Sequence, residues 1–292
     1  MKILITGGTG YVGSHILRQL ADQGHQLTVF SRQRRELPIA VEWIIGDLAE
    51  GSPDLGGYQV LIHNAVVWSE DADDLEMWDL RSSARLFDEA GKAGVQHVIF
   101  TSSTAVHRPF QQQMSEGTPA RSNDYYGSTK ASGEVFLSAA AEQYGFLWTV
   151  LRPSMVIGQP AFPSQQVKID RRFKALFDAA IAGTAITVSR GDGRQFTPVQ
   201  DLAKAFAKVV DIQPSGGVFL CLGAELITWE EVARKVVALT SSQSEIVLNE
   251  SVPICRFNTD KVSRELGITF DYGATLDEHL AAIADILLGH RG

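Results

Sequence analysis

The sequence predicts an α/β protein, in which a doubly wound parallel sheet is followed by a smaller C-terminal region. Over residues 3–151, short apolar runs rich in β-branched residues alternate with segments whose apolar residues recur at helical spacing. Strands that are joined by crossover helices produce this pattern. The first run leads directly into a glycine-rich turn and a helix, as in a Rossmann-type dinucleotide fold. After residue 153 the alternation loosens, so we expect a substrate-binding region there.

The glycine-rich turn after the first strand predicts a dinucleotide site. Gly7 or Gly8 can supply the positive φ that a tight turn needs, Gly10 lets a pyrophosphate approach the backbone, and Gly13 lets the next helix pack closely on the strand. That helix begins at Tyr11 and Val12, and its N-terminus offers free N–H groups to the phosphates. Because a strand precedes the glycines and a helix follows them, we predict cofactor binding rather than a merely structural turn.

The end of the second strand, residues 26–30, predicts the type of cofactor. An NAD site usually carries Asp or Glu there to bind the ribose 2′-OH. This chain instead has Ser31 and Arg32, followed by Arg34 and Arg35. A hydroxyl and a guanidinium can hold a 2′-phosphate, and no carboxylate is present to repel it. The sequence therefore favours NADP(H) and leaves NAD(H) as the alternative.

Further strands are predicted at residues 41–45, 59–63, 96–100 and 146–151, with long helices at 73–90 and 125–144. The residues that follow the strands meet at one edge of the sheet, where a cofactor binds. We expect this set to include Asp47, Leu48, Asn64, Ala65, Val66 and Thr101. Asp47 suits either the adenine amino group or a turn. We interpret His63 as a buried histidine with satisfied hydrogen bonds.

Shorter helices and strands are predicted in the C-terminal half. Helices are expected at 166–182, 201–210, 229–239, 259–266 and 276–288, and strands at 185–188, 195–199 and 217–222. One of these strands returns to the main sheet. We therefore assign residues 1–152 and 195–222 to a dinucleotide-binding domain, and residues 153–194 and 223–292 to a substrate-binding region.

The composition excludes several classes of protein. With 292 residues, of which 45% are hydrophobic, the chain can bury a large core. A formal net charge of -8 disfavours nucleic acid as a partner. Cys221 and Cys255 are too few for a disulfide framework or a metal site, and we expect both in the core. Without a signal peptide or a membrane-spanning apolar run, we expect a cytoplasmic protein with no membrane partner.

Tyr126 and Lys130 carry the candidate chemistry. They are four residues apart at the start of a predicted helix and so share one face. A tyrosine has a reference pKa of about 10, and a nearby positive charge favours its phenolate. The ammonium and an oxidised nicotinamide would both supply such charge, so Tyr126 suits general acid/base work. Lys130 would also reach the nicotinamide ribose, and Ser103 would donate to the substrate oxygen.

Five motifs, in chain order, resemble those of the extended short-chain dehydrogenase/reductase family, the NAD(P)-dependent epimerase/dehydratase group. TGGTGYVG and YGSTK match its glycine and Tyr-Lys motifs, and TSSTAVH, LRPSMVIG and RQFTPVQD resemble three more. The resemblance implies Ser103, Tyr126 and Lys130 as the catalytic set, and Pro153 to Val156 near the carboxamide. It also implies a homodimer built from the two long helices. The substrate contacts that we expect are Ser103, Thr104, Met155 and Arg194.

Departures from the family pattern bear on the substrate. The 4,6-dehydratases place Asp-Glu directly after the catalytic Ser/Thr, where this chain has Thr104-Ala105, so dehydration is disfavoured. Met155 stands near a usual epimerase Asn, and residues 253–257 lack the Arg-x-Gly-Asp that grips a nucleotide diphosphate. His107 replaces a usual Tyr, and Val66 replaces a usual Gly or Ala.

Three functions follow from the sequence. The first is an NAD(P)-dependent oxidoreductase that moves hydride between nicotinamide and a small-molecule carbonyl or alcohol carbon. The second is a redox-neutral epimerase that holds NAD tightly and acts on a nucleotide sugar. The third is a non-catalytic regulatory or RNA-binding relative, which Tyr126, Lys130 and the acidic charge disfavour. We expect the first, because Ser31 and Arg32 suit NADPH.

Overall fold

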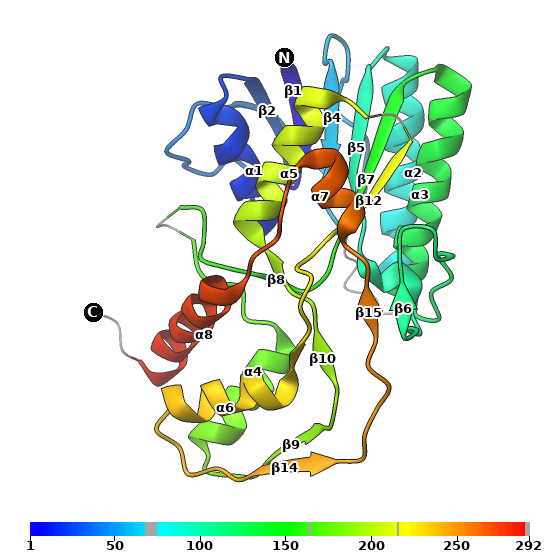
Figure 1. Ribbon diagram of the computed structural model, residues 1–292. Helices are drawn as coiled ribbons and strands as arrows, with labels where there is room; N and C mark the ends of the chain where they lie inside the picture. Colours follow the sequence, from blue (N-terminus) through cyan, green and yellow to red (C-terminus); the bar gives the residue numbers. More distant parts are fainter. Residues whose placement is uncertain (68–74, 163–164, 215, 290–292) are drawn as a thin grey trace.

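The computed structural model describes residues 1–67, 75–162, 165–214 and 216–289. Figure 1 shows a sheet covered by helices on both faces, with a smaller part below it. In the described residues the sheet has seven strands in the order β12-β7-β5-β4-β1-β2-β3, and all its neighbouring pairs are parallel. The strands are β1 (Lys2–Thr6), β2 (Gln26–Ser31), β3 (Glu42–Ile45), β4 (Val60–His63), β5 (His97–Thr101), β7 (Leu147–Pro153) and β12 (Gly217–Cys221).

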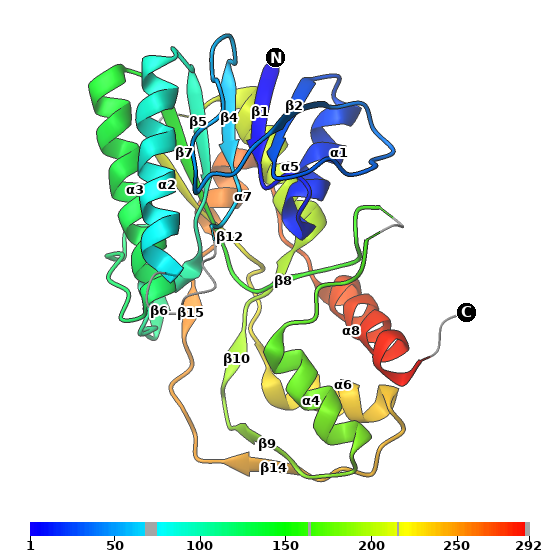
Figure 2. The same cartoon turned by 180° about the vertical axis from the view of Figure 1, so that it is seen from behind.

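Two layers of helices cover the sheet (Figures 1 and 2). On one face, α1 (Tyr11–Asp22), α5 (Val199–Ile212) and α7 (Asp260–Leu266) share an apolar cluster with the sheet that includes Leu17 and Phe206. On the other face, α2 (Leu75–Lys92) and α3 (Tyr125–Tyr144) bury Phe87 and Leu137. Such burial of large side chains is the main stabilising contribution to a fold of this kind. The predicted doubly wound α/β class is therefore confirmed.

The smaller part has its own apolar core. It contains α4 (Arg171–Ile181), α6 (Trp229–Leu239) and α8 (Gly273–Leu288), which pack around Phe173, Phe196 and Trp229. The parallel pair β9 (Ile186–Ser189) and β14 (Ile246–Asn249) forms its lower edge (Figure 1). None of the helices in the described residues is long and apolar enough to cross a bilayer.

Short strand pairs and one 3-10 turn, η1 (Thr104–His107), lie below the sheet, toward the smaller part. The sequence did not predict the strand pairs, because two residues show no periodicity. They bring the C-terminal half against the ends of the sheet strands. The pairs are β8 (Val156–Ile157) with β11 (Thr197–Pro198), β10 (Gly193–Arg194) with β13 (Ile227–Thr228), and β6 (Gln113–Met114) with β15 (Arg256–Phe257).

The structure corrects three details of the sequence analysis. The helix expected from residue 166 begins at Arg171, because the Asp170 side chain accepts from the Arg172 backbone N–H and caps it. The strand expected at 195–199 is interrupted, and α5 already begins at Val199. Cys255 is half-buried rather than in the core.

The helix α7 also lies elsewhere than expected. The sequence analysis assigned residues 223–292 to the substrate-binding region. Within that range, Val262 and Leu266 of α7 are buried against the main sheet and α5. Because these apolar side chains are buried there, the chain makes one more return to the main sheet than the periodicity indicated.

Candidate active site

A cavity of about 690 Å³ lies at the carboxyl ends of the sheet strands. The strand order reverses between β1 and β4, and in open α/β sheets ligands bind at such a switch point. Gly13 and Lys130 lie behind the cavity wall. The other predicted site residues line the cavity, namely Gly7, Gly10, Tyr11, Val12, Ser31, Arg32, Asp47, Leu48, Asn64, Ala65, Val66, Thr101, Ser103, Thr104, Tyr126, Pro153, Met155, Val156 and Arg194.

The glycine turn is tightly packed. Gly7 has a φ of 69°, which L side chains rarely adopt. A Cβ on Gly13 would lie 2.1 Å from the Gly7 carbonyl oxygen, so α1 can approach β1 only with glycine there. Gly10 is the N-cap of α1, and its N–H donates to the Gly7 carbonyl over 3.1 Å. The first N–H groups of α1 therefore face the cavity in the manner that a phosphate requires.

The end of β2 forms one end of the cavity. Ser31 and Arg32 line it, and the Ser31 hydroxyl donates to the Gln33 carbonyl over 2.7 Å. The side chain of Arg32 is exposed and can turn toward an anion. Asp47 also lines this end, while its carboxylate accepts from the Ala49 N–H over 2.9 Å. Asp47 therefore closes a turn and faces the cavity, so both interpretations of it fit the geometry.

Ser103 and Tyr126 both line the cavity. Ser103 is the N-cap of η1, where its hydroxyl oxygen accepts from the Ala105 N–H over 3.1 Å. Asp124 caps α3 by accepting from the Gly127 N–H over 2.9 Å. A Cβ on Gly127 would lie 2.4 Å from the Ala105 carbonyl oxygen, so α3 begins in close contact with η1. Both caps thus fix the two hydroxyl groups in relation to each other.

Lys130 lies one helical turn after Tyr126, beneath the cavity. Its ammonium is 3.2 Å from the Asp79 carboxylate, and the side chains are only 2% and 4% exposed. The second oxygen of Asp79 accepts from the Val67 N–H over 2.9 Å. Sequence reasoning missed Asp79. The available signal was its position on the buried face of α2, seven residues before Leu86.

A buried polar network lies behind Ser103. The Arg152 Nε donates to Glu134 over 2.8 Å, and the Ser102 hydroxyl donates to the same carboxylate. Arg152 also donates to the His107 Nε2 over 3.0 Å. Burial, together with the charge of Arg152, lowers the pKa of His107 to about 4, so this imidazole is neutral near pH 7 and can accept. The network joins β7, α3, η1 and the end of β5.

Cationic and aromatic side chains gather on another part of the cavity wall. Arg108, Phe110 and Lys168 line it beside Arg194, and the sequence analysis had not singled them out. The guanidinium carbons of Arg108 and Arg194 lie 5.8 and 5.6 Å from the Phe110 ring centroid. Burial lowers the pKa of Arg194, while Asp192 opposes this at 3.6 Å. This end of the cavity suits an anionic or aromatic group.

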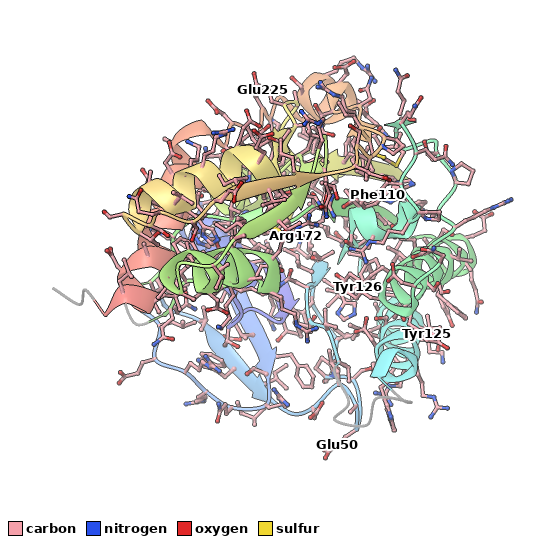
Figure 3. The ribbon with its side chains drawn as sticks, turned by 90° about the horizontal axis from the view of Figure 1, so that it is seen from below. Glu50, Phe110, Tyr125, Tyr126, Arg172 and Glu225 are labelled. Atoms are coloured by element: carbon pink, nitrogen blue, oxygen red, sulfur yellow. The ribbon has the colours of Figure 1, made fainter. Side chains whose placement is uncertain are left out.

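Figure 3 shows this arrangement from below. Tyr126 points toward the centre of the molecule, and Tyr125 lies on the outer side of α3. Phe110 lies nearer the centre than Tyr125 does. A smaller cavity of about 290 Å³ shares Phe110 and Arg194 with the main one, and half-buried Cys255 lines it.

His63 does not line the cavity. It is fully buried, and its ring nitrogens lie 2.7 Å from the Thr6 hydroxyl and 2.9 Å from the Ser83 hydroxyl. Burial lowers the pKa of His63 to about 3. Its interpretation as a buried, hydrogen-bonded histidine is confirmed.

Comparison with known proteins shows which family and which enzymes the chain is similar to. Residues 3–221 match the model of the NAD dependent epimerase/dehydratase family. A UDP-glucose 4-epimerase of Corynebacterium glutamicum is 27% identical over 239 residues, which are 74% of this chain and 73% of that protein. A 3 beta-hydroxysteroid dehydrogenase/Delta 5-->4-isomerase of Mycobacterium tuberculosis is 28% identical over 261 residues, 81% of this chain and 68% of that one.

Solved structures show the same architecture. MoeE5 in complex with UDP-glucuronic acid and NAD superposes with a TM-score of 0.79 at 21% identity, and the match covers 100% of both chains. At this identity the likeness establishes a shared fold.

The glycine turn leads to a testable prediction. Gly13→Ala is expected to weaken the binding of NADPH and NADH more than tenfold, because its Cβ would push the Gly7 carbonyl and deform the phosphate cradle. Fluorescence titration with either cofactor measures this. Gly51→Ala is the matched control, since a Cβ there meets nothing within 4 Å. Wild-type affinity of Gly13→Ala would show that the turn does not hold the phosphates.

Proposed function

The chain belongs to the NAD-dependent epimerase/dehydratase family, and we propose that it is an NADP(H)-dependent oxidoreductase. It would transfer hydride between the nicotinamide and a carbonyl or hydroxyl carbon. The observation that carries the cofactor assignment is the end of β2, where Ser31 and Arg32 line the cavity. The glycine cradle at Gly10 and the N-terminus of α1 fit the pyrophosphate of such a cofactor.

Tyr126 would protonate the substrate oxygen, and Ser103 would donate a hydrogen bond to it. In the direction of reduction, the Tyr126 hydroxyl gives its proton to the carbonyl oxygen as hydride arrives at the carbon. The Ser103 oxygen accepts from Ala105, which leaves the Ser103 hydrogen to donate toward the same substrate oxygen. The bound cofactor supplies the hydride. Asn64 accepts from the Thr101 hydroxyl over 3.0 Å, which orders the cavity wall between the two ends.

A sugar-nucleotide epimerase is the second candidate. The observation that favours it is the pair of guanidinium groups on Arg108 and Arg194, which suits a phosphorylated substrate. Such an enzyme oxidises and re-reduces one substrate, so it keeps its cofactor bound. Mass spectrometry of the purified protein separates the candidates. Retained NAD(H) would support the epimerase, and an empty protein that exchanges NADPH freely would support the oxidoreductase.

We also propose that α3 faces a second copy of the chain. Its outer side exposes Tyr125, Val135 and Phe136, of which Tyr125 is 81% and Val135 67% exposed. The adjacent α2 packs along α3 and would complete the contact surface (Figure 2). Apolar side chains that gather on one face are typical of an interface.

The dimer proposal predicts a change of mass. Val135→Glu is expected to convert the dimer to a monomer, because it places a charge in the apolar contact. Light scattering coupled to size exclusion measures the mass. Ile212→Glu, at another exposed apolar position on α5, should leave the dimer intact. A wild-type protein that is already monomeric would contradict the proposal.

The cofactor proposal predicts a selective loss of affinity. Arg32→Ala is expected to weaken NADPH by about 10- to 100-fold and NADH by less than about twofold, because only NADPH carries the 2′-phosphate. Fluorescence titration gives both constants. Arg34→Ala is the control, because Arg34 is exposed and does not line the cavity. Equal losses for the two cofactors would mean that Arg32 does not contact the phosphate.

The assignment of Tyr126 predicts a loss of chemistry without a loss of binding. Tyr126→Phe is expected to lower turnover at least about 100-fold and to keep NADPH affinity within about threefold, because only the proton donor is removed. NADPH oxidation with a panel of aldehydes and ketones measures turnover. Tyr125→Phe, at the exposed neighbouring position, should behave as wild type. Surviving turnover in Tyr126→Phe would move the proton donor elsewhere.

A further inference from the structure

The ion pair of Lys130 with Asp79 joins two helices beneath the candidate active site. The two side chains come from α3 and α2, and both are almost completely buried. The ammonium also lies 5.0 Å from the Phe100 ring centroid. Asp79 makes a second contact with the Val67 N–H, and Val67 lines the same cavity as Tyr126. The pair therefore lies directly behind the cavity wall.

Within the part of the chain that the structure describes, two further ionisable groups near the pair do not balance the charge of Lys130. His63 lies close enough to interact with both members, but burial keeps it neutral, because its pKa is lowered to about 3. Glu134, one turn further along α3, is already engaged by Arg152. Among the described residues, Asp79 is thus the acid in contact with Lys130.

A cavity wall with an unbalanced ammonium would discriminate between the two forms of the cofactor. The oxidised nicotinamide ring is a cation, and the reduced ring is neutral. A buried positive charge nearby repels only the oxidised form, and the low dielectric of the interior strengthens this repulsion. A carboxylate 3.2 Å from the ammonium cancels most of that field at the ring.

We propose that Asp79 is a positioning residue whose carboxylate balances the charge of Lys130 at the end of the cavity where the nicotinamide would lie. It fixes the ammonium of Lys130 and cancels its charge, so that the site binds the oxidised and the reduced nicotinamide with similar affinity. Asp79 acts through Lys130 and the cavity wall and does not touch substrate. The inference rests on the proposed function only in that a nicotinamide occupies this end.

The test is the ratio of the dissociation constants of NADP⁺ and NADPH. Asp79→Asn keeps the size of the side chain and the acceptor for the Val67 N–H but removes the charge. We expect the ratio to rise about tenfold, with NADP⁺ weakened and NADPH nearly unchanged. A purely structural role would weaken both forms together. A ratio within twofold of the wild-type value would overturn the proposal.

Three further variants complete the experiment. Asp88→Asn removes an acid from an exposed ion pair on α2, the helix that carries Asp79, and its ratio should stay within twofold of wild type. The double variant Asp79→Asn/Lys130→Met removes both charges and should restore the wild-type ratio. If Asp79→Asn alone does not fold, Lys130→Met decides, because it leaves the carboxylate without its counter-charge, and the ratio should fall about tenfold. An unchanged ratio in that variant would overturn the proposal.

The same titrations keep this inference separate from the proposed function. The preference between NADP(H) and NAD(H) tests the role of Arg32, whereas the preference between oxidised and reduced forms tests Asp79. If the chain prefers NAD(H), the ratio is measured with NAD⁺ and NADH. Either conclusion can then fail while the other stands.

Discussion

The buried ion pair of Arg152 with Glu134 is the interaction on which the candidate active site depends. Arg152 precedes the cavity residue Pro153, Glu134 belongs to the helix that carries Tyr126, and Ser102 and His107 bond to the same pair. Both charges are withdrawn from water, so the loss of one partner would cost about 3–5 kcal/mol. The hydroxyls of Ser103 and Tyr126 therefore keep their relative positions only while this network stays complete.

A second set of contacts joins the helix after the glycine turn to the segment after β8. One face of α1 presents Tyr11, His15 and Arg18, whose side chains meet the carbonyl oxygens of residues 158, 159 and 161. The Tyr11 contact is 2.8 Å long and the His15 contact is 2.9 Å long. The helix whose N-terminus lines the cavity is thus also the helix that holds the segment after β8. A displacement of α1 would therefore move both the glycine turn and the segment after β8.

The sequence predicted those features that local patterns encode. Alternating periodicities predicted the sheet and its order of elements, the glycine spacing predicted the tight turn before α1, and the family to which the motifs pointed is the family to which the chain belongs. The contact of Lys130 with Asp79 was not predictable in this way, because the partner lies on another helix and only tertiary packing brings it there. The cluster of Arg108, Phe110 and Arg194 was missed for the same reason, since the first two follow η1 and only tertiary packing brings Arg194 of β10 to them.

The chain passes repeatedly between the sheet and the smaller part, and this limits how specificity can evolve. After β7 it leaves the sheet, it returns for α5 and β12, it leaves again for α6 and β14, and it returns once more for β15 and α7 (Figure 1). The wall of the cavity on this side is consequently assembled from non-contiguous stretches. A single crossover between two related genes would exchange only part of it. Its shape changes one position at a time, by substitutions at residues such as Met155, Phe110 and Arg194 within an inherited frame.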